Sequence, residues 1–383
     1  MTTAPTLRTI LREWGRIGCI GFGGPPTHIA LLRDLCVRRS DWMTEQEFED
    51  AIAACNLLPG PASTQLAIFC AWRQRGRVGA LVGGVAFIVP GLIVILALAA
   101  LFLTGSPPAW VRGAGTGAGA AVAAVAVHAG VGLVPASWQR VTGTDRVRWV
   151  SYLAAGGAAA ATVGPWLVLV LLACGGIEVV RQQTRRPRGV LTFIAAKPVA
   201  IAAGAGGLLS VVWAAFKVGA LSYGGGFVII PLMRADAVDH YHWMTGGQFL
   251  NAVALGQITP GPVVQTVAVV GYSAAGLLGG VLAALVAFSP SFAFVLLGAQ
   301  HFDRLRGNDH VRAFLGGAGP AAIGAIFGSA VPLARALTQP WQFAVLGGAA
   351  VALLALRRGV VLTLLVAAAT GALLAVAGVG IPR

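Results

Sequence analysis

The stretch Asn56-Leu-Leu-Pro-Gly-Pro-Ala-Ser-Thr-Gln65 breaks an apolar region, and it returns later as Gln257-Ile-Thr-Pro-Gly-Pro-Val-Val-Gln-Thr266. The two Pro-Gly-Pro motifs are 201 residues apart, and without a gap this offset aligns residues 18–61 with 219–262. Of these 44 aligned positions, 16 are identical. A repeat on this scale predicts two homologous halves, residues 1–188 and 197–383, joined by a basic linker at 181–197.

The composition of the chain is that of a membrane protein. Of its 383 residues 57% are hydrophobic and 10% are charged, whereas a soluble domain carries about 25% charged residues. Several stretches approach or exceed the roughly 20 apolar residues that cross a bilayer; they are Val78–Leu103, Gly113–Val134, Gly276–Ala299 and Val360–Val379. The sequence therefore predicts an all-α polytopic protein whose surroundings are the lipid bilayer.

The formal net charge is +14, which could suggest nucleic-acid binding. The arginines, however, follow one another in short loops between apolar stretches, as is typical of cytoplasmic loops. We therefore expect no nucleic-acid partner. The positive field favours an anionic solute over a cation.

The basic loops of the two halves are not equivalent. In the first half they lie at residues 73–77, 140–148 and 181–188, and in the second at 304–312 and 357–358. This exchange predicts an inverted repeat, which requires an odd number of crossings per half. We expect about ten net crossings in all, with a re-entrant segment in each half taken from Trp14–Leu32 or Phe48–Trp72 and its counterpart.

A glycine motif precedes each Pro-Gly-Pro: Gly21-Phe-Gly-Gly-Pro-Pro26 in the first half and Ser222-Tyr-Gly-Gly-Gly-Phe227 in the second. Adjacent glycines and prolines interrupt a helix. A helix that restarts after the break points free N–H groups into the gap and can hold an oxyanion there. The alternative is a tight glycine contact between helices.

Polar side chains flank the Pro-Gly-Pro breaks, and irregular backbone at membrane depth survives only inside protein or beside a wet cavity. Arg33 and Arg234 follow the glycine motifs, and an arginine fork suits a tetrahedral oxyanion. Kinks with satisfied amides and plain interfacial arginines are the alternatives. The candidate binding residues are Gly21, Phe22, Gly23, Gly24, Pro25, Arg33, Asn56, Pro59, Gly60, Pro61, Thr64, Gln65, Ser222, Tyr223, Gly224, Gly225, Gly226, Arg234, Gln257, Pro260, Gly261, Pro262, Gln265 and Thr266.

Other residues are assigned more modest roles. We expect Glu178 to reach toward the linker arginines, and His28 and His128 are lone candidates for a proton role. Gly113-Ala-Gly-Thr-Gly-Ala118 fits a loose dinucleotide pattern but has no preceding strand, so it predicts a helix-packing face. The five cysteines form no C-x-x-C pair. We expect no metal, no cofactor and no catalytic residue.

Together these motifs resemble the chromate ion transporter family in its long, two-domain form. The resemblance runs through Gly21–Pro25, Arg33, Trp42-Met43-Thr44 and Pro59–Pro61 and repeats in the second half. It implies inversely oriented halves and export of chromate across the bacterial inner membrane, giving chromate resistance. Alternatives are a carrier of sulfate or another oxyanion, a membrane-embedded enzyme, and a sensor. A homodimer is left open.

Overall fold

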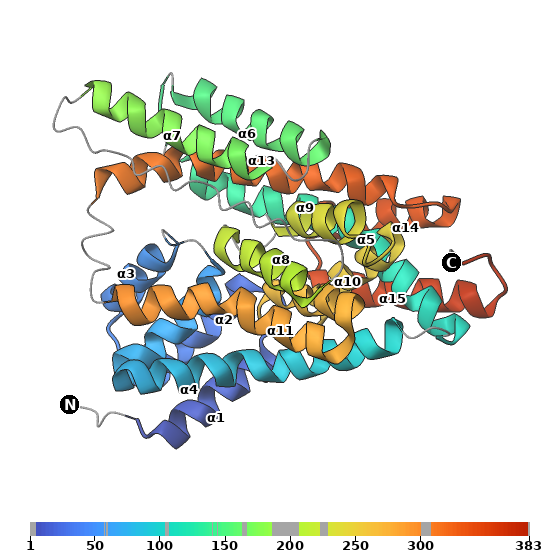
Figure 1. Ribbon diagram of the computed structural model, residues 1–383, viewed down its shortest axis with the longest axis horizontal. Helices are drawn as coiled ribbons and strands as arrows, with labels where there is room; N and C mark the ends of the chain where they lie inside the picture. Colours follow the sequence, from blue (N-terminus) through green and yellow to red (C-terminus); the bar gives the residue numbers. More distant parts are fainter. Residues whose placement is uncertain are drawn as a thin grey trace.

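The computed structural model describes residues 5–56, 58, 60–103, 107–139, 141–143, 145–162, 167–185, 207–222, 229–299 and 308–381. These residues are all-helical apart from their turns (Figure 1). Five candidate residues, Pro59, Tyr223, Gly224, Gly225 and Gly226, lie outside the described residues, as does residue 186 onward of the linker.

The helices of the first half have counterparts in the same order in the second half. The first half contains α1 (Leu7–Ile20), α2 (Pro25–Arg33), the π-helical turn η1 (Asp34–Arg39), α3 (Glu45–Cys55), α4 (Ala62–Phe102), α5 (Ala109–Trp138), α6 (Asp145–Thr162) and α7 (Leu167–Arg185). The second contains α8 (Leu208–Leu221), α9 (Ile229–Arg234), η3 (Ala235–His240), α10 (Gly246–Ile258), η4 (Val263–Gln265), α11 (Thr266–Gly298), α13 (Asp309–Arg335), α14 (Pro340–Ala350), η6 (Val351–Ala355) and α15 (Val360–Val376).

Membrane-spanning helices are present in both halves. Within the described residues five helices are long and apolar enough to cross a bilayer: Ala62–Phe102, Ala109–Trp138, Leu167–Thr184, Val263–Gly298 and Asp309–Arg335. Shorter apolar helices accompany them, including Leu208–Leu221 and Val360–Val376. The prediction of a polytopic α-helical membrane protein is confirmed at this level.

Both α4 and α11 double back on themselves. Their helical geometry is interrupted at Arg75–Gly76 and at Ala275–Gly276, where the two glycines have φ of 57° and 61°. Glycine adopts these angles at no steric cost. After each reversal a glycine, Gly79 or Gly279, packs on the carbonyl of Ala71 or Gly271 in the segment before it. Each is therefore a hairpin of a short and a long helical segment.

These reversals change the register of the repeat. Gly76 and Gly276 are 200 residues apart, as are the helix-interior prolines Pro90 and Pro290. The sequence comparison, which kept an offset of 201, aligned Gln65 with Thr266. That alignment is wrong by one residue, because the second half is one residue shorter between Pro-Gly-Pro and the reversal. Gln65 and Gln265 are the true counterparts.

The long segments of α4 and α11 lie side by side and run antiparallel. Gly84 packs on the ring of Phe292, whereas Leu96, further along α4, packs on Gly280, which is earlier in α11. The first helix of each half packs against the long segment of the same half. Gly18 of α1 sits on the carbonyl of Phe87, and its counterpart Gly219 of α8 sits on that of Ala287.

The remaining long helices pack mainly on helices of the other half. Gly117 of α5 packs on the carbonyl of Ala367 in α15, and its counterpart Gly317 of α13 packs on that of Cys174 in α7. In Figure 1, α6 and α7 accordingly lie beside α13. Gly113 also faces α15, so the predicted helix-packing face is confirmed.

Glu178 was expected to reach toward the linker arginines, which from residue 186 onward lie outside the described residues; the described partners of Glu178 are on α6. Its carboxylate pairs with Arg148 at 2.7 Å and accepts a hydrogen bond from Tyr152 at 2.9 Å. Because α6 and α7 lie side by side, this pair ties the two helices together.

Candidate functional site

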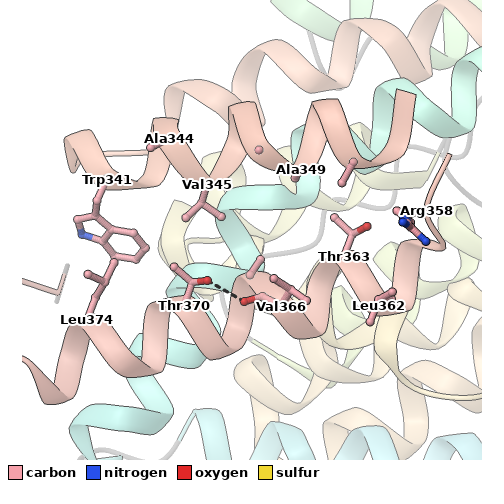
Figure 2. A pocket seen from close by; sticks show the side chains of 13 residues that line it. Trp341, Ala344, Val345, Ala349, Arg358, Leu362, Thr363, Val366, Thr370 and Leu374 are labelled. Atoms are coloured by element: carbon pink, nitrogen blue, oxygen red, sulfur yellow. Dashed lines mark hydrogen bonds between the residues drawn. The ribbon is translucent and has the colours of Figure 1, made fainter. Parts of the chain in front are cut away.

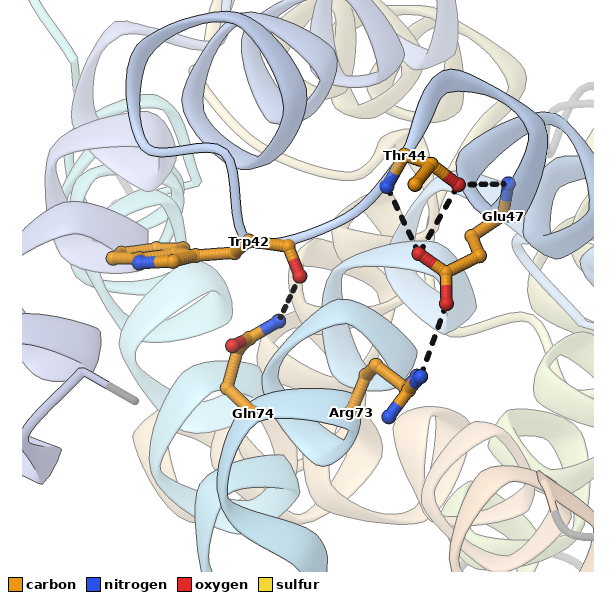
Figure 3. Close-up of polar contacts among 5 residues, drawn as sticks. All are labelled: Trp42, Thr44, Glu47, Arg73 and Gln74. Carbon is orange, nitrogen blue, oxygen red and sulfur yellow. Dashed lines mark hydrogen bonds and ion pairs between the residues drawn. The ribbon is translucent and has the colours of Figure 1, made fainter. Parts of the chain in front are cut away.

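Gly60 and Pro61 of the first Pro-Gly-Pro motif lie at the tip of the helical hairpin that α3 forms with the short segment of α4. The base of this hairpin brings the start of α3 to the end of the short segment of α4 (Figure 3). There Glu47 pairs with Arg73 at 3.0 Å, and Gln74 donates a hydrogen bond to the carbonyl of Trp42 at 3.4 Å. Thr44 and Glu47 close a capping box on α3. Because these contacts join the base, Asn56, Leu58, Gly60 and Pro61 lie at the opposite end of the hairpin.

The second half builds the same hairpin with neutral groups. Ser273 donates a hydrogen bond to the carbonyl of Trp243 at 2.7 Å, and Thr245 and Gln248 form the capping box on α10. The tip of this hairpin is Pro260-Gly261-Pro262, followed by the 3-10 turn η4. The two hairpins therefore differ at the base, where the first has an ion pair and the second has hydrogen bonds between neutral groups. Their tips share the Pro-Gly-Pro sequence.

Each tip is bound by the glycine break of the other half. The N–H of Gly60 donates to the carbonyl of Ser222 at 2.8 Å, and the N–H of Gly261 donates to the carbonyl of Gly21 at 3.0 Å. Ser222 is the repeat counterpart of Gly21, so the two contacts are reciprocal. We call them the crossed contacts. They bring Gly60 to Ser222 and Gly261 to Gly21, so that each duplicated motif contacts one from the other half.

The crossed contacts need glycine. Gly60 and Gly261 have φ of +125° and +99°, which side chains with a Cβ rarely adopt. The long segment of α4 passes close to the second tip at Gly91, where an added Cβ would meet the carbonyl of Pro260 and lie 2.6 Å from Gln265 Oε1. Gln265 also donates a hydrogen bond to the carbonyl of Ile88 at 2.8 Å. The second tip is thereby held against α4.

Buried polar atoms without a hydrogen-bond partner lie in these motifs and beside them. Within the described residues they include Thr64 Oγ1, Ser222 Oγ, Ser291 Oγ, Gln257 Nε2 and Gln265 Oε1. Burial of an unsatisfied polar group costs about 1–3 kcal/mol. Four of these atoms, three hydroxyls and one amide nitrogen, can donate to an anion. Sites that hold such unsatisfied donors are suited to a ligand that accepts hydrogen bonds.

Helix ends contribute further donors at the tip. Because α4 begins at Ala62, directly after Pro61, the N–H groups of Ala62 and Ser63 have no acceptor within the helix, and they lie at the positive end of its dipole. The start of α2, which the sequence predicted to offer free N–H groups, has fewer of them. Its first two residues are Pro25 and Pro26, which have no N–H to offer.

Most of the predicted site residues that the structure describes are in or beside the tips. Gly21, Gly60, Pro61, Thr64, Gln65, Ser222, Gln257, Pro260, Gly261, Pro262, Gln265 and Thr266 are buried there. Gly24 and Pro25 are partly buried, and an added Cβ at Gly24 would lie 3.7 Å from Val263 of the other half. Phe22, Gly23 and Asn56 are exposed.

The two predicted arginines occupy other places. Arg33 pairs with Glu45 at 3.0 Å and with Glu49, both in the first half of α3, whereas Pro-Gly-Pro follows the other end of that helix. Arg234 pairs with Asp239 at 2.9 Å. Both guanidinium groups are thus neutralised by carboxylates of their own half.

His28 supports the glycine break. It is fully buried, with Nε2 2.9 Å from the carbonyl of Gly21 and Nδ1 3.3 Å from Ser63 Oγ. These two contacts connect α2 with the start of α4. Its position beside a crossed contact gives this histidine a structural role that its isolated place in the sequence did not reveal.

Sequence reasoning missed Ser291 and Gly91, which are counterparts at the 200-residue offset. Ser291 Oγ lies 3.1 Å from the place that a Cβ on Gly60 would take, and Gly91 lies against the second tip. The available signal was the proline pair Pro90 and Pro290, which immediately precedes them. It was overlooked because the offset of 201 pairs Pro90 with Ser291 rather than with Pro290.

Comparison with known proteins gives matches over both halves. Residues 8–179 and 209–374 match the chromate transporter family model. The chain is 34% identical over 346 residues to a chromate transport protein of Cupriavidus metallidurans, covering 87% of this chain and 84% of that protein. It is 28% identical over 343 residues to a chromate transport protein of Pseudomonas aeruginosa, covering 85% and 80%. No solved structure matches.

Proposed function

This chain belongs to the chromate transporter family, and from that premise we propose that it exports chromate at the crossed contacts. It is a multi-pass membrane transporter and not an enzyme. We further propose that it acts as a secondary transporter in the bacterial inner membrane and confers chromate resistance.

One observation carries the choice of site: the reciprocal bonds from Gly60 to Ser222 and from Gly261 to Gly21. They join two broken segments from each half. The buried donors Thr64 and Gln257 lie in the same motifs, and Ser291 lies beside Gly60. A chromate ion presents only acceptor oxygens, so hydroxyl, amide and helix-terminal N–H groups complement it. Binding sites of repeat transporters occur where broken helices of the two repeats meet.

The orientation of the halves supports alternating access. The counterpart segments of α4 and α11 run antiparallel, as an inverted repeat requires. In Figure 1, α3 and the N-terminus lie toward one end of the molecule, and α14 and the C-terminus toward the other. We propose that the two hairpins enter the membrane from opposite sides, so that their tips meet inside it and the linker at 181–197 is cytoplasmic.

The membrane potential favours the outward direction. Moving one elementary charge across 100 mV changes the free energy by about 2.3 kcal/mol, so a dianion leaving a negative cytoplasm gains about 4.6 kcal/mol. Export therefore needs no coupling ion. Uptake would have to be coupled to several cations.

The test is chromate flux in proteoliposomes with an imposed potential of either sign and with excess sulfate as competitor. We expect flux toward the positive side that sulfate barely inhibits. Strong inhibition by sulfate would indicate a general carrier of tetrahedral oxyanions. No flux at either polarity would contradict uncoupled export.

Matched serine variants locate the site. Ser291→Ala removes a buried hydroxyl without a described partner, and a hydrogen bond to a charged group contributes about 1.5–3 kcal/mol. The apparent KM for chromate should rise roughly 10- to 150-fold. Ser289→Ala is the control, because Ser289 is exposed and donates to the carbonyl of Val286 in its own helix. Equal flux in both variants would remove Ser291 from the site.

A further inference from the structure

A groove runs between α14 and α15, far in sequence from the hairpin tips (Figure 2). Its volume is about 530 Å³. One wall is a face of α14 and η6 built from small residues, among them Ala344, Gly348 and Ala349. The other wall is a face of α15 from Leu362 to Leu374. At 1.5 Å per residue this face is about 18 Å long.

The walls of the groove suit an apolar ligand. The hydroxyls among its lining residues belong to Thr363 and Thr370, and each donates to the carbonyl four residues earlier in the chain, at 3.0 and 2.9 Å. These hydroxyls therefore have no proton left for a ligand. Leu362 and Val366 are more than half exposed in the groove wall, which leaves apolar surface for an occupant to cover.

One end of the groove is positively charged. Arg358 lines that end, opposite Trp341 (Figure 2). It lies in the turn between η6 and α15, next to Arg357, and within the described residues no carboxylate lies within ion-pair distance of either arginine. A guanidinium group binds a phosphate through two parallel hydrogen bonds.

The counterpart helices of the first half are joined by polar side-chain contacts. There α6 and α7 are tied by the pair between Arg148 and Glu178 and by the hydrogen bond from Tyr152. No ion pair links α14 and α15 within the part of the chain that the structure describes. The described parts of the two halves therefore differ at this place.

The geometry points to a binding site for an anionic phospholipid, with one acyl chain in the groove and its phosphate on Arg358. A long apolar slot with a basic end complements an amphiphile that has an anionic head, and basic pockets between membrane helices bind such head groups. The bilayer supplies this ligand along the length of the exposed helices. This site is independent of the proposed transport site.

Native mass spectrometry of the full chain, released from nanodiscs of equal phosphatidylglycerol and phosphatidylcholine, tests the proposal. The wild type should retain phosphatidylglycerol in preference to phosphatidylcholine. A basic side chain near an anionic surface contributes about fivefold in affinity, so Arg358→Gln should lower the preference by about that factor. Arg357→Gln, which removes the adjacent charge outside the groove lining, should leave it unchanged.

Two glycine variants test the apolar part. At both Gly348 and Gly347 an added Cβ would meet nothing within 4 Å, but only Gly348 lines the groove. Gly348→Leu should abolish lipid retention and Gly347→Leu should preserve it. Equal retention in the two leucine variants, or equal loss in the two glutamine variants, overturns the proposal. Loss of a dimer in Gly348→Leu alone also overturns it, because the groove would then hold a second copy of the chain.

Discussion

The close approach of α4 to the second tip makes Gly91→Ala a sharp test of the crossed contacts. The added methyl group would meet the carbonyl of Pro260 and lie 2.6 Å from Gln265 Oε1. The carbonyl belongs to the backbone of the tip and cannot rotate away, so the tip must move. We expect this movement to weaken the bond from Gly261 to Gly21, which is 3.0 Å long in the wild type.

The magnitude follows from overpacking. Forcing a methyl group into a filled site costs about 1–3 kcal/mol, and weakening one hydrogen bond adds about 0.5–1.5 kcal/mol. If the tip must keep its place for chromate to bind, the flux at low chromate should fall by at least about tenfold, since 1.4 kcal/mol is a factor of ten. The assay is initial chromate flux in proteoliposomes at matched protein content.

A glycine with free space provides the control. At Gly176 in α7 an added Cβ would meet nothing within 4 Å, and alanine is the better helix former by about 1 kcal/mol. Gly176→Ala should therefore keep wild-type flux and stability. The reasoning is refuted if Gly91→Ala also keeps both, because the tip would then not depend on the close approach.

Three further variants test individual contacts. Trp14→Phe removes the hydrogen bond to the carbonyl of Ala67, so thermal denaturation should show that the free energy of unfolding falls by about 1–3 kcal/mol. The control is Trp110→Phe, which should leave this free energy unchanged because Trp110 is half exposed. Arg33→Ala should change flux less than about fivefold, because exposed ion pairs contribute about 0–1 kcal/mol; a larger loss would return Arg33 to the binding site. Hydrogen bonding from the backbone N–H of Thr44 lowers the pKa of Glu47 from its usual 4.5. The stabilisation by Glu47 should be complete above pH 4.5 and lost as the pH falls through the lowered pKa. A pH series of melting temperatures should show this loss in the wild type but not in Glu47→Gln. A glutamine at this position can close the capping box without a charge, as Gln248 does in the second half.

The helix breaks were predictable from local chemistry. Pro-Gly-Pro and the glycine motifs have few conformations in common with a continuous helix, and Gly60 and Gly261 indeed take positive φ. What binds each break was not predictable in this way. The partner of Gly60 is Ser222, and that contact depends on how two halves pack rather than on any local preference.

Charges were harder to assign than breaks. Arg33 has the right chemistry for an oxyanion, but Glu45 and Glu49 compete for it, and proximity to them comes from the turn between α2 and α3. Similarly, Glu178 pairs with Arg148 because α6 and α7 are adjacent. In both cases the sequence supplied the residue types, while the tertiary structure selected the partners.

The exchange of α5 and α13 between the halves has a consequence for biogenesis. While the first half is being synthesised, α6 and α7 enter the bilayer without α13, the helix on which Gly317 and Phe314 pack against Cys174 and Gly175. Membrane helices insert as stable units before they associate. We therefore expect the helices of the first half to stay loosely associated until the second half has been inserted. Its final packing is completed only after the ribosome has delivered the second half. Each half thus acts as the assembly template of the other, and a chain cut at the linker should mature only when both pieces are made in the same cell.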